Sequence, residues 1–212
     1  MTQFEKQYYE KRGQQLVKNL NARFFEAYYC DNKEEAKKKA LELIPEGSVV
    51  GWGGCLSAEQ IDLVDEMRHG NYRAIDRDAA SSPEERMDLM RRCLLSDVFI
   101  TGANAISMDG QMVNIDGMGN RVSAIVFGPK SVVVIAGMNK VVDTVEDAVV
   151  RARTVAAPTN KQRFPAPTPC MVTGTCANCK GEGSICNQFL ITRICRPAGR
   201  IKFILVGEDL GF

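Results

Sequence analysis

Ser48-Val49-Val50-Gly51-Trp52-Gly53-Gly54-Cys55-Leu56-Ser57 is the stretch that decides the fold. Its first half is a short apolar run, which is typical of a buried strand. The glycines permit a tight turn, and a helix is predicted to begin at Ser57, with Gln60 completing a capping box. The stretch therefore predicts a strand, a glycine turn and a helix, which is the repeating unit of an α/β fold.

The same alternation continues along the chain. Ser82-Pro83-Glu84 is a strong helix start, and a further helix is predicted from Asp143 or Thr144 to about Thr154. Strands are predicted at 72–75, 97–101, 131–136, 188–195 and 200–206. Strands alternating with helices predict a three-layer, mostly parallel sheet. The last two strands flank Pro197-Ala198-Gly199 and predict a C-terminal β-hairpin.

Residues 4–44 carry a helical pattern on the N-terminal side. The apolar positions recur near the 3.6-residue period, and Asp31 with Glu34 is predicted to cap a second helix. We therefore expect an N-terminal helical arm at 1–45 and an α/β domain at 46–212, with an irregular cysteine-rich insertion at about 165–188. Such arms often serve in oligomer contacts, so a homo-oligomer is expected.

Composition limits the partners. The 212 residues include 27 Lys+Arg and 26 Asp+Glu, a net charge of +1, which argues against a nucleic-acid-coating protein. The longest apolar run, Val132–Met138, is far shorter than the roughly 20 residues of a membrane span. The polar stretch Met1–Lys11 predicts no secretory signal, so we expect a cytoplasmic protein. Residues 151–202 nevertheless hold nine basic residues and one acidic residue. A small anionic ligand or an acidic partner would suit such a face, and a solvated surface is the alternative.

Two segments are predicted to bind a ligand. Glycine turns before a helix bind anions through backbone N–H groups, although this one lacks the dinucleotide fingerprint and the P-loop lysine. The segment 101–121 is a polar loop dense in Gly, Asn and Asp after a buried strand. Either segment can also be explained as turn chemistry alone. The predicted ligand-binding residues are Gly51, Gly53, Gly54, Ser57, Gly102, Asn104, Asn114, Gly117 and Asn120.

Cysteines supply two further candidates. Cys55 beside the glycine turn is a candidate nucleophile, because a helix N-terminus lowers a thiol pKa. Cys170-x5-Cys176-x2-Cys179-x6-Cys186 places four thiols in one irregular segment. Four thiolates suit zinc or an iron–sulfur cluster, so Cys170, Cys176, Cys179 and Cys186 are the predicted metal ligands. The spacing matches neither a zinc ribbon nor a ferredoxin, and paired disulfides or free thiols remain open.

Several motifs resemble one family. Ser96–Ile106, Asp109-Gly110, Val113–Gly117 and Gly119–Val122 look like the LUD-domain family of lactate utilization proteins. Further matching stretches are Phe127–Lys130, Ala136–Lys140, Ala156–Pro158 and Val206–Phe212. The resemblance covers about residues 10–212 and is densest over 96–158.

The resemblance implies a fold like that of ribose-5-phosphate isomerase, glucosamine-6-phosphate deaminase and the CoA transferases. In that group the glycine turn holds phosphate or a similar anion. Glu59 stands where a family glutamate is frequent, so the resemblance adds Glu59 to the predicted ligand-binding residues. Asn104 stands where the sugar-phosphate isomerase pattern has a catalytic aspartate, which argues against isomerase activity. Asp109 and Asp116 are the candidate substitutes.

The resemblance also implies a function. LUD proteins of the lactate-oxidation system work beside iron–sulfur partners, which suggests a component or accessory of L-lactate oxidation to pyruvate. A non-catalytic anion-binding regulatory module is one alternative. An enzyme acting on a small phosphorylated or CoA-linked substrate is the other.

Overall fold

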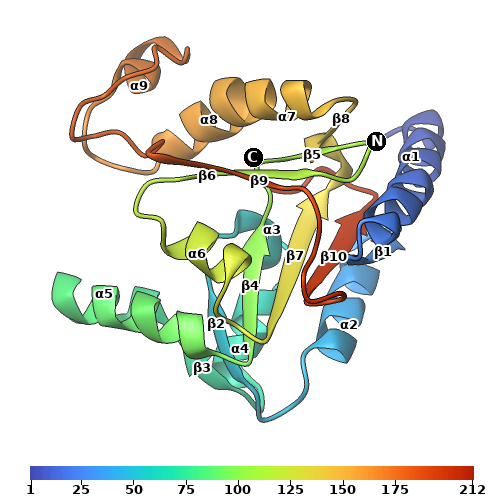
Figure 1. Ribbon diagram of the computed structural model, residues 1–212, viewed down its shortest axis with the longest axis horizontal. Coiled ribbons are helices and arrows are strands. Elements are labelled where there is room, and N and C mark those ends of the chain that lie inside the picture. The colour runs from blue at the N-terminus through green and yellow to red at the C-terminus, as the bar shows by residue number, and fades with distance from the viewer.

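Six parallel strands form the main sheet of the computed structural model, which describes residues 1–212 (Figure 1). Each strand pairs with its neighbours in parallel register, so their carboxyl ends meet at one edge. This confirms the predicted mostly parallel sheet. In spatial order the strands are β1 (Glu26–Cys30), β10 (Ile201–Val206), β7 (Ser131–Gly137), β4 (Val98–Gly102), β2 (Val49–Trp52) and β3 (Arg73–Ile75).

A second, smaller sheet begins where β4 ends. Its strands are, in spatial order, β8 (Val141–Val142), β5 (Ala105–Ser107), β6 (Met112–Asp116) and β9 (Gln188–Thr192). β5 and β6 form an antiparallel pair, β9 pairs antiparallel with β6, and β8 pairs parallel with β5. The predicted polar loop at 101–121 is therefore a β-hairpin, and its polar residues lie in and around two strands.

Helices cover both faces of the main sheet. On one face, α2 (Lys33–Leu43), α3 (Leu56–Glu59) and α4 (Leu63–His69) contribute to a core of 19 buried residues. On the other face, α1 (Gln3–Ala22) and the second sheet share a separate core of 16 buried residues with β7 and β10. The remaining α-helices are α5 (Pro83–Arg92), α6 (Asn120–Val126), α7 (Val145–Arg151), α8 (Ala157–Lys161) and α9 (Pro169–Thr173).

Local sequence explains the elements that frame the site. The six residues Val132–Gly137 of β7 are all buried, as expected for a central parallel strand covered on both faces. Ser82 caps α5 by accepting a hydrogen bond from the Glu85 N–H at 3.1 Å, and Pro83 fills the first helical position. A short π-helix, Ala152–Ala156, links α7 to α8 across the outer face of the second sheet. No helix combines the length and apolarity needed to cross a bilayer.

The N-terminal segment differs from its prediction. Residues 26–30 are strand β1, paired with β10, rather than part of a helix. The chain leaves α1 through Phe24, whose φ of 62° breaks the helical run. Asn32, not Asp31, caps α2 by accepting from the Glu35 N–H at 2.9 Å. The first 45 residues are therefore built into the main sheet and its core, because tertiary pairing outweighs helix propensity at β1.

The C-terminal β-hairpin is also absent. β9 joins the second sheet through β6, whereas β10 inserts between β1 and β7 of the main sheet. The two strands predicted at this end of the chain do exist, but the turn between them carries the chain from one sheet to the other. A sequence pattern identifies strands more readily than it identifies their partners.

Candidate anion-binding site

A cleft lies where the carboxyl ends of β2, β4 and β7 meet. Its inner part, about 40 Å³, lies between the turn Gly54–Ser57, the segment Gly102–Asn104 and Lys140. Its outer part, 330 Å³, is continuous with it through Gly54 and Arg121 and extends to Arg77 and Asp116. We call the two parts together the anion cleft. Open α/β sheets bind ligands at this edge, because successive strand ends and helix starts converge there.

Lys140 reaches the inner part from the turn after β7. Its side chain is buried, and its Nζ donates a hydrogen bond to Ser57 Oγ at 3.0 Å. Burial lowers the pKa of Lys140 to about 8, with Arg151 and Arg121 adding to the effect and Cys55 opposing it. Lys140 thus holds a costly positive charge beside the glycine turn.

Arg121, in the first turn of α6, is the second cation of the inner part. Its guanidinium donates to the Asn104 side-chain oxygen at 3.3 Å and to the Ile115 carbonyl. Burial lowers the pKa of Arg121, although the Asp116 charge opposes this. Asn104 Oδ1 also accepts from the Ile115 N–H at 2.8 Å, so this side chain is fixed. Because Asn104 is a neutral amide, it positions Arg121 without cancelling its charge.

Arg151 is the third cation, and it approaches from α7. It donates to the Asn104 carbonyl at 2.6 Å and to the Asn139 carbonyl at 3.2 Å. Burial lowers its pKa as well. All hydrogen-bond partners of these three side chains are neutral, whereas Arg86 in the outer part of the cleft is paired with Asp78 at 2.9 Å. The inner part of the cleft is consequently positive: no Asp or Glu side chain lines it, although the charge of Asp116 in the outer part acts on Arg121.

Asp116 stands at the rim of the outer part. Its carboxylate accepts from the N–H groups of Arg121 at 3.0 Å and Val122 at 3.1 Å, which caps α6 from outside the helix. Gly119, the residue that precedes the helix, has a φ of 86° and supplies no side-chain cap. Asp116 therefore has a structural role in placing Arg121, in addition to lining the cleft.

Cys55 lines the inner part, but its thiol differs from the expectation. The residue is buried, and burial raises the pKa of Cys55 even though the Lys140 charge lowers it. The predicted effect of the helix N-terminus is outweighed because α3 has only four residues and the thiol lies in the core. Cys55 is protonated at neutral pH, and a protonated thiol is a poor nucleophile.

Most of the predicted ligand-binding residues come together in the cleft. Gly54, Ser57, Gly102 and Asn104 line the inner part, while Glu59, Gly117 and Asn120 line the outer part. Three others lie outside it. Gly51 lies within β2, where a Cβ would come within 2.6 Å of Cys93 Sγ, and Gly53 packs behind Arg121. Asn114 is buried in the second sheet, where it donates to the Gly102 carbonyl at 3.0 Å.

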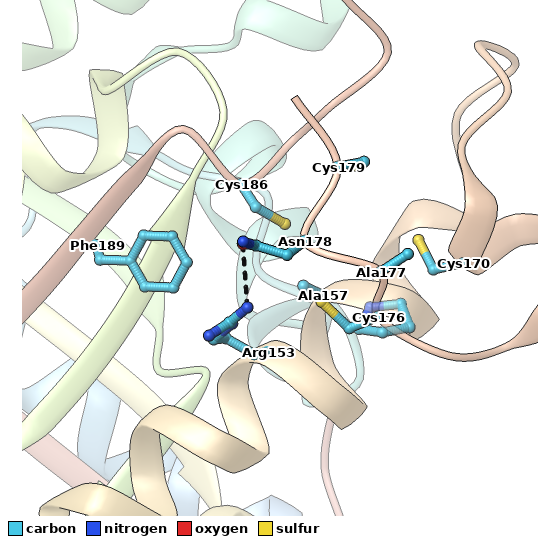
Figure 2. Close-up of a pocket in the computed structure, with 10 residues that line it drawn as sticks. Arg153, Ala157, Cys170, Cys176, Ala177, Asn178, Cys179, Cys186 and Phe189 are labelled. Carbon is cyan, nitrogen blue, oxygen red and sulfur yellow. Dashed lines mark hydrogen bonds between the residues drawn. The ribbon is translucent and has the colours of Figure 1, made fainter. Parts of the chain in front are cut away.

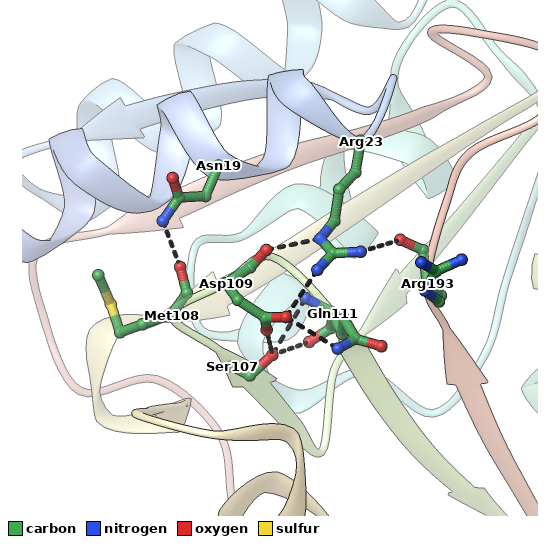
Figure 3. Close-up of polar contacts among 7 residues, drawn as sticks. All are labelled: Asn19, Arg23, Ser107, Met108, Asp109, Gln111 and Arg193. Carbon is green, nitrogen blue, oxygen red and sulfur yellow. Dashed lines mark hydrogen bonds and ion pairs between the residues drawn. The ribbon is translucent and has the colours of Figure 1, made fainter.

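Asp109 lies away from the cleft, at the β5–β6 turn against the end of α1 (Figure 3). Arg23 donates to its carboxylate at 2.6 Å, and Gln111 donates to it at 2.9 Å. Burial would raise the pKa of Asp109, but the hydrogen bonds from Ser107 and Gln111 and the charge of Arg23 hold it below its usual value. The structure thus gives Asp109 a docking contact with α1, next to the bond from Asn19 to the Met108 carbonyl at 2.6 Å.

A match to a protein-family model shows which family the chain belongs to. The model of the LUD domain matches residues 13–206. The chain belongs to the LUD-domain family. A crystal structure of a DUF162 family protein from Deinococcus radiodurans is similar to this LUD domain with a TM-score of 0.53 and 14% identity, covering 93% of this chain and 97% of that chain. The likeness shows a shared fold.

A second structural match is weaker than the first. A 5-methylthioribose 1-phosphate isomerase from Pyrococcus horikoshii OT3 matches with a TM-score of 0.37 and 16% identity, covering 74% of this chain and 50% of that chain. A search of curated protein sequences found no match. The LUD-domain family is associated with lactate utilization.

The site of this LUD domain includes cations that the sequence reasoning missed. Lys140, Arg121, Arg151 and Arg163 were not among the predicted ligand-binding residues, although all but Arg151 line the cleft directly. One signal was available: Lys140 follows the buried strand 131–136 after a glycine, at the end where ligands bind. Arg151 ends α7 and Arg163 lies just after α8, and only the fold brings them to this edge.

The four predicted metal-ligand cysteines of the LUD domain line one separate pocket (Figure 2). The Arg153 guanidinium donates to the Asn178 side-chain oxygen at 3.1 Å across this pocket. Burial raises the pKa of Cys186 to about 11, and the charges of Cys176, Cys179 and Cys170 add to this. All four residues are free thiols.

Proposed function

We propose that this LUD-domain protein binds a small carboxylate or phosphate anion in the anion cleft. Its place would be that of an accessory to the oxidation of L-lactate to pyruvate, beside iron–sulfur partner proteins. One observation carries the binding proposal: Lys140 and Arg121 line the inner part of the cleft, Arg151 is bonded to the Asn104 carbonyl beside them, and none of the three pairs with a carboxylate. The family's association with lactate utilization supports the metabolic context.

The energetics favour an anion there. A buried cation without a counter-charge is expensive, and an opposite charge repays part of that cost. The inner volume of about 40 Å³ offers room for about three water molecules. A carboxylate or phosphate group fills a similar space. The Ser57 hydroxyl and Lys140 ammonium would donate to its oxygens, while the outer part would take the rest of a small molecule.

The residues of the cleft favour ligand binding over a reaction in which Asn104 transfers a proton. Asn104 cannot exchange a proton at neutral pH, and both its side-chain contacts are structural. This favours the non-catalytic anion-binding module over an isomerase-type enzyme. The outer part contains Arg77 and Arg86, which both pair with Asp78, and Arg163, which forms no ion pair. Arg163 would suit a second anionic group of a phosphorylated or CoA-linked molecule.

A panel of anions tests the proposal. Pyruvate, L-lactate and inorganic phosphate are titrated into the protein at constant ionic strength, with chloride as the control, and binding is measured by calorimetry and thermal unfolding. We expect pyruvate or L-lactate to raise the free energy of unfolding by about 2.7 kcal/mol at a hundredfold excess over Kd. Binding of phosphate alone would contradict the lactate context, and no effect beyond that of chloride would contradict anion binding.

The affinity for pyruvate is expected to depend on pH through Lys140. The lowered pKa of about 8 means that the free cleft loses its ammonium charge as the pH rises through 8, and an anion must then bind together with a proton. We expect the affinity to fall roughly tenfold between pH 7 and pH 9. Pyruvate keeps the same charge over this range. A Lys140→Arg variant, charged throughout, should show a flat profile, and an equally flat wild-type profile would exclude this linkage.

A further inference from the structure

Four thiols surround the pocket at the outer edge of the second sheet. In Figure 2 the loop that carries Cys176 and Cys179 passes between Cys186 on one side and Cys170 on the other. The other lining residues are mostly apolar and include Ala157, at the start of α8, and Phe189 of β9. Segments up to 16 positions apart in the sequence thus bring soft sulfur donors to one small cavity of about 40 Å³.

The segment that carries these thiols has almost no core of its own. Between α8 and β9, residues 162–187 contain a single buried residue, Thr168. The four cysteines are only half-exposed, although most of their neighbours in the segment are exposed. Small proteins with too little buried core are commonly held by disulfides or a bound metal, and a segment with one buried residue would gain from a cross-link in the same way. The thiols that line the pocket are the groups in a position to provide it.

The ligand-type side chains of this pocket favour one kind of metal centre, an iron–sulfur cluster. The lining residues include no His, Asp or Glu, so the pocket offers thiol ligands only. A single zinc ion needs its four sulfurs about 2.3 Å from one point. No three ligand-type side chains of this chain are grouped closely enough to hold one common ion. In an iron–sulfur cluster each thiolate binds at the periphery, so the four thiolates surround the cluster instead of meeting at a point.

We propose that Cys170, Cys176, Cys179 and Cys186 bind an iron–sulfur cluster. The cluster and its thiolates carry negative charge, which the Arg153 guanidinium beside the pocket offsets. The hydrogen bond from Arg153 to Asn178 holds the loop that carries Cys176 and Cys179 against the body. The apolar wall of Ala157, Pro158 and Phe189 shields one side of the centre from water. This site is separate from the anion cleft.

Anaerobic reconstitution tests the proposal on the full-length protein. The metal-free protein is incubated with ferrous iron and sulfide under thiol-reducing conditions and is then freed of unbound metal. We expect bound iron and acid-labile sulfide, together with a broad visible absorbance that bleaches on reduction with dithionite. Stoichiometric zinc in place of iron, or no retained metal, would overturn the assignment. Disulfides among these four cysteines in anaerobically purified protein would also overturn it.

Matched variants locate the centre. Cys176→Ala and Cys186→Ala should abolish the visible absorbance and the retained iron, whereas Cys30→Ala, which alters a buried cysteine of β1, should leave both unchanged. Circular dichroism and anion binding at the cleft report whether each variant is folded. Retention of the absorbance in folded Cys176→Ala and Cys186→Ala would overturn the proposal. Reconstitution of the wild-type protein is measured independently of the variants. It therefore still tests the proposal if a variant does not fold.

Discussion

Replacing Lys140 with methionine is expected to stabilise the ligand-free protein and to weaken its anion binding at least tenfold. The ammonium is buried next to Arg121 and Arg151, and the pKa of Lys140 falls from 10.5 to about 8. One pKa unit corresponds to about 1.4 kcal/mol, so the charge costs the folded state about 3 kcal/mol at pH 7. Methionine fills a similar volume without a charge. It supplies neither a positive charge nor a hydrogen-bond donor to an anion.

The sign of the pH dependence makes this prediction specific. A lysine with a lowered pKa in the folded state destabilises that state in full below pH 8, and the penalty disappears as the pH rises to 10.5. The gain from Lys140→Met should thus be about 1–3 kcal/mol at pH 7 and close to zero near pH 10.5. Urea unfolding at several pH values measures it.

Lys38→Met provides the control, because Lys38 is an exposed lysine of α2. It should change neither stability nor anion binding appreciably. A Lys140→Met protein that is less stable than wild type at pH 7 would show that Lys140 is satisfied without a ligand. Unchanged pyruvate affinity in the Lys140→Met variant would show that Lys140 does not contribute to anion binding.

Replacing Phe203 with alanine is expected to be among the most destabilising single changes in the core. Phe203 is fully buried on β10, between β1 and β7, and its ring meets Phe25 edge-on at 5.2 Å. Removing such a ring leaves a cavity and costs about 3–5 kcal/mol. For a chain of this size the melting temperature should fall by roughly 6–20 °C. Differential scanning calorimetry measures the change.

Phe4→Ala is the matched control for this prediction. Phe4 lies in the first turn of α1 with 80% of its surface exposed, so its removal should change stability by less than about 0.5 kcal/mol. Equal effects of the two substitutions would show that β10 does not anchor the core shared by α1 and the second sheet. A small loss at Phe203 alone would mean that this core collapses around the missing ring.

Helix α8 places the two proposed sites next to each other. Ala157 and Pro158, at its start, line the cysteine pocket, whereas Asn160 and Arg163, at and just beyond its end, line the anion cleft. The outer part of the cleft also touches Ile185, the residue before Cys186. Ordering of the cysteine segment by a bound cluster would accordingly restrict one wall of the cleft.

Individual elements show how far the sequence pattern could reach. The strand, glycine turn and helix around Gly51–Ser57 were predictable, since local propensity and tertiary role agree there. β1 was not, because Glu26–Cys30 follows a helical pattern and becomes a strand only by pairing with β10. The hairpin β5–β6 was hidden by its own polar residues, Asn104, Asp109 and Asn114. The Asn104 and Asn114 side chains are bound to backbone groups inside the structure, whereas Asp109 stays half-exposed in the turn and is bound by Arg23.

The sequence by itself determined the alternation of strands and helices, the glycine turn, the family and the grouping of four cysteines. All of these are carried by residues that are neighbours along the chain. Only the tertiary structure decided that Lys140 and Arg121 line one cleft, with Arg151 beside it and none of the three paired with a carboxylate, and that Asp109 docks α1 instead of lining that cleft. The reason is physical: the cost of a charge depends on its burial and its neighbours in space, and those are set by segments distant in the sequence.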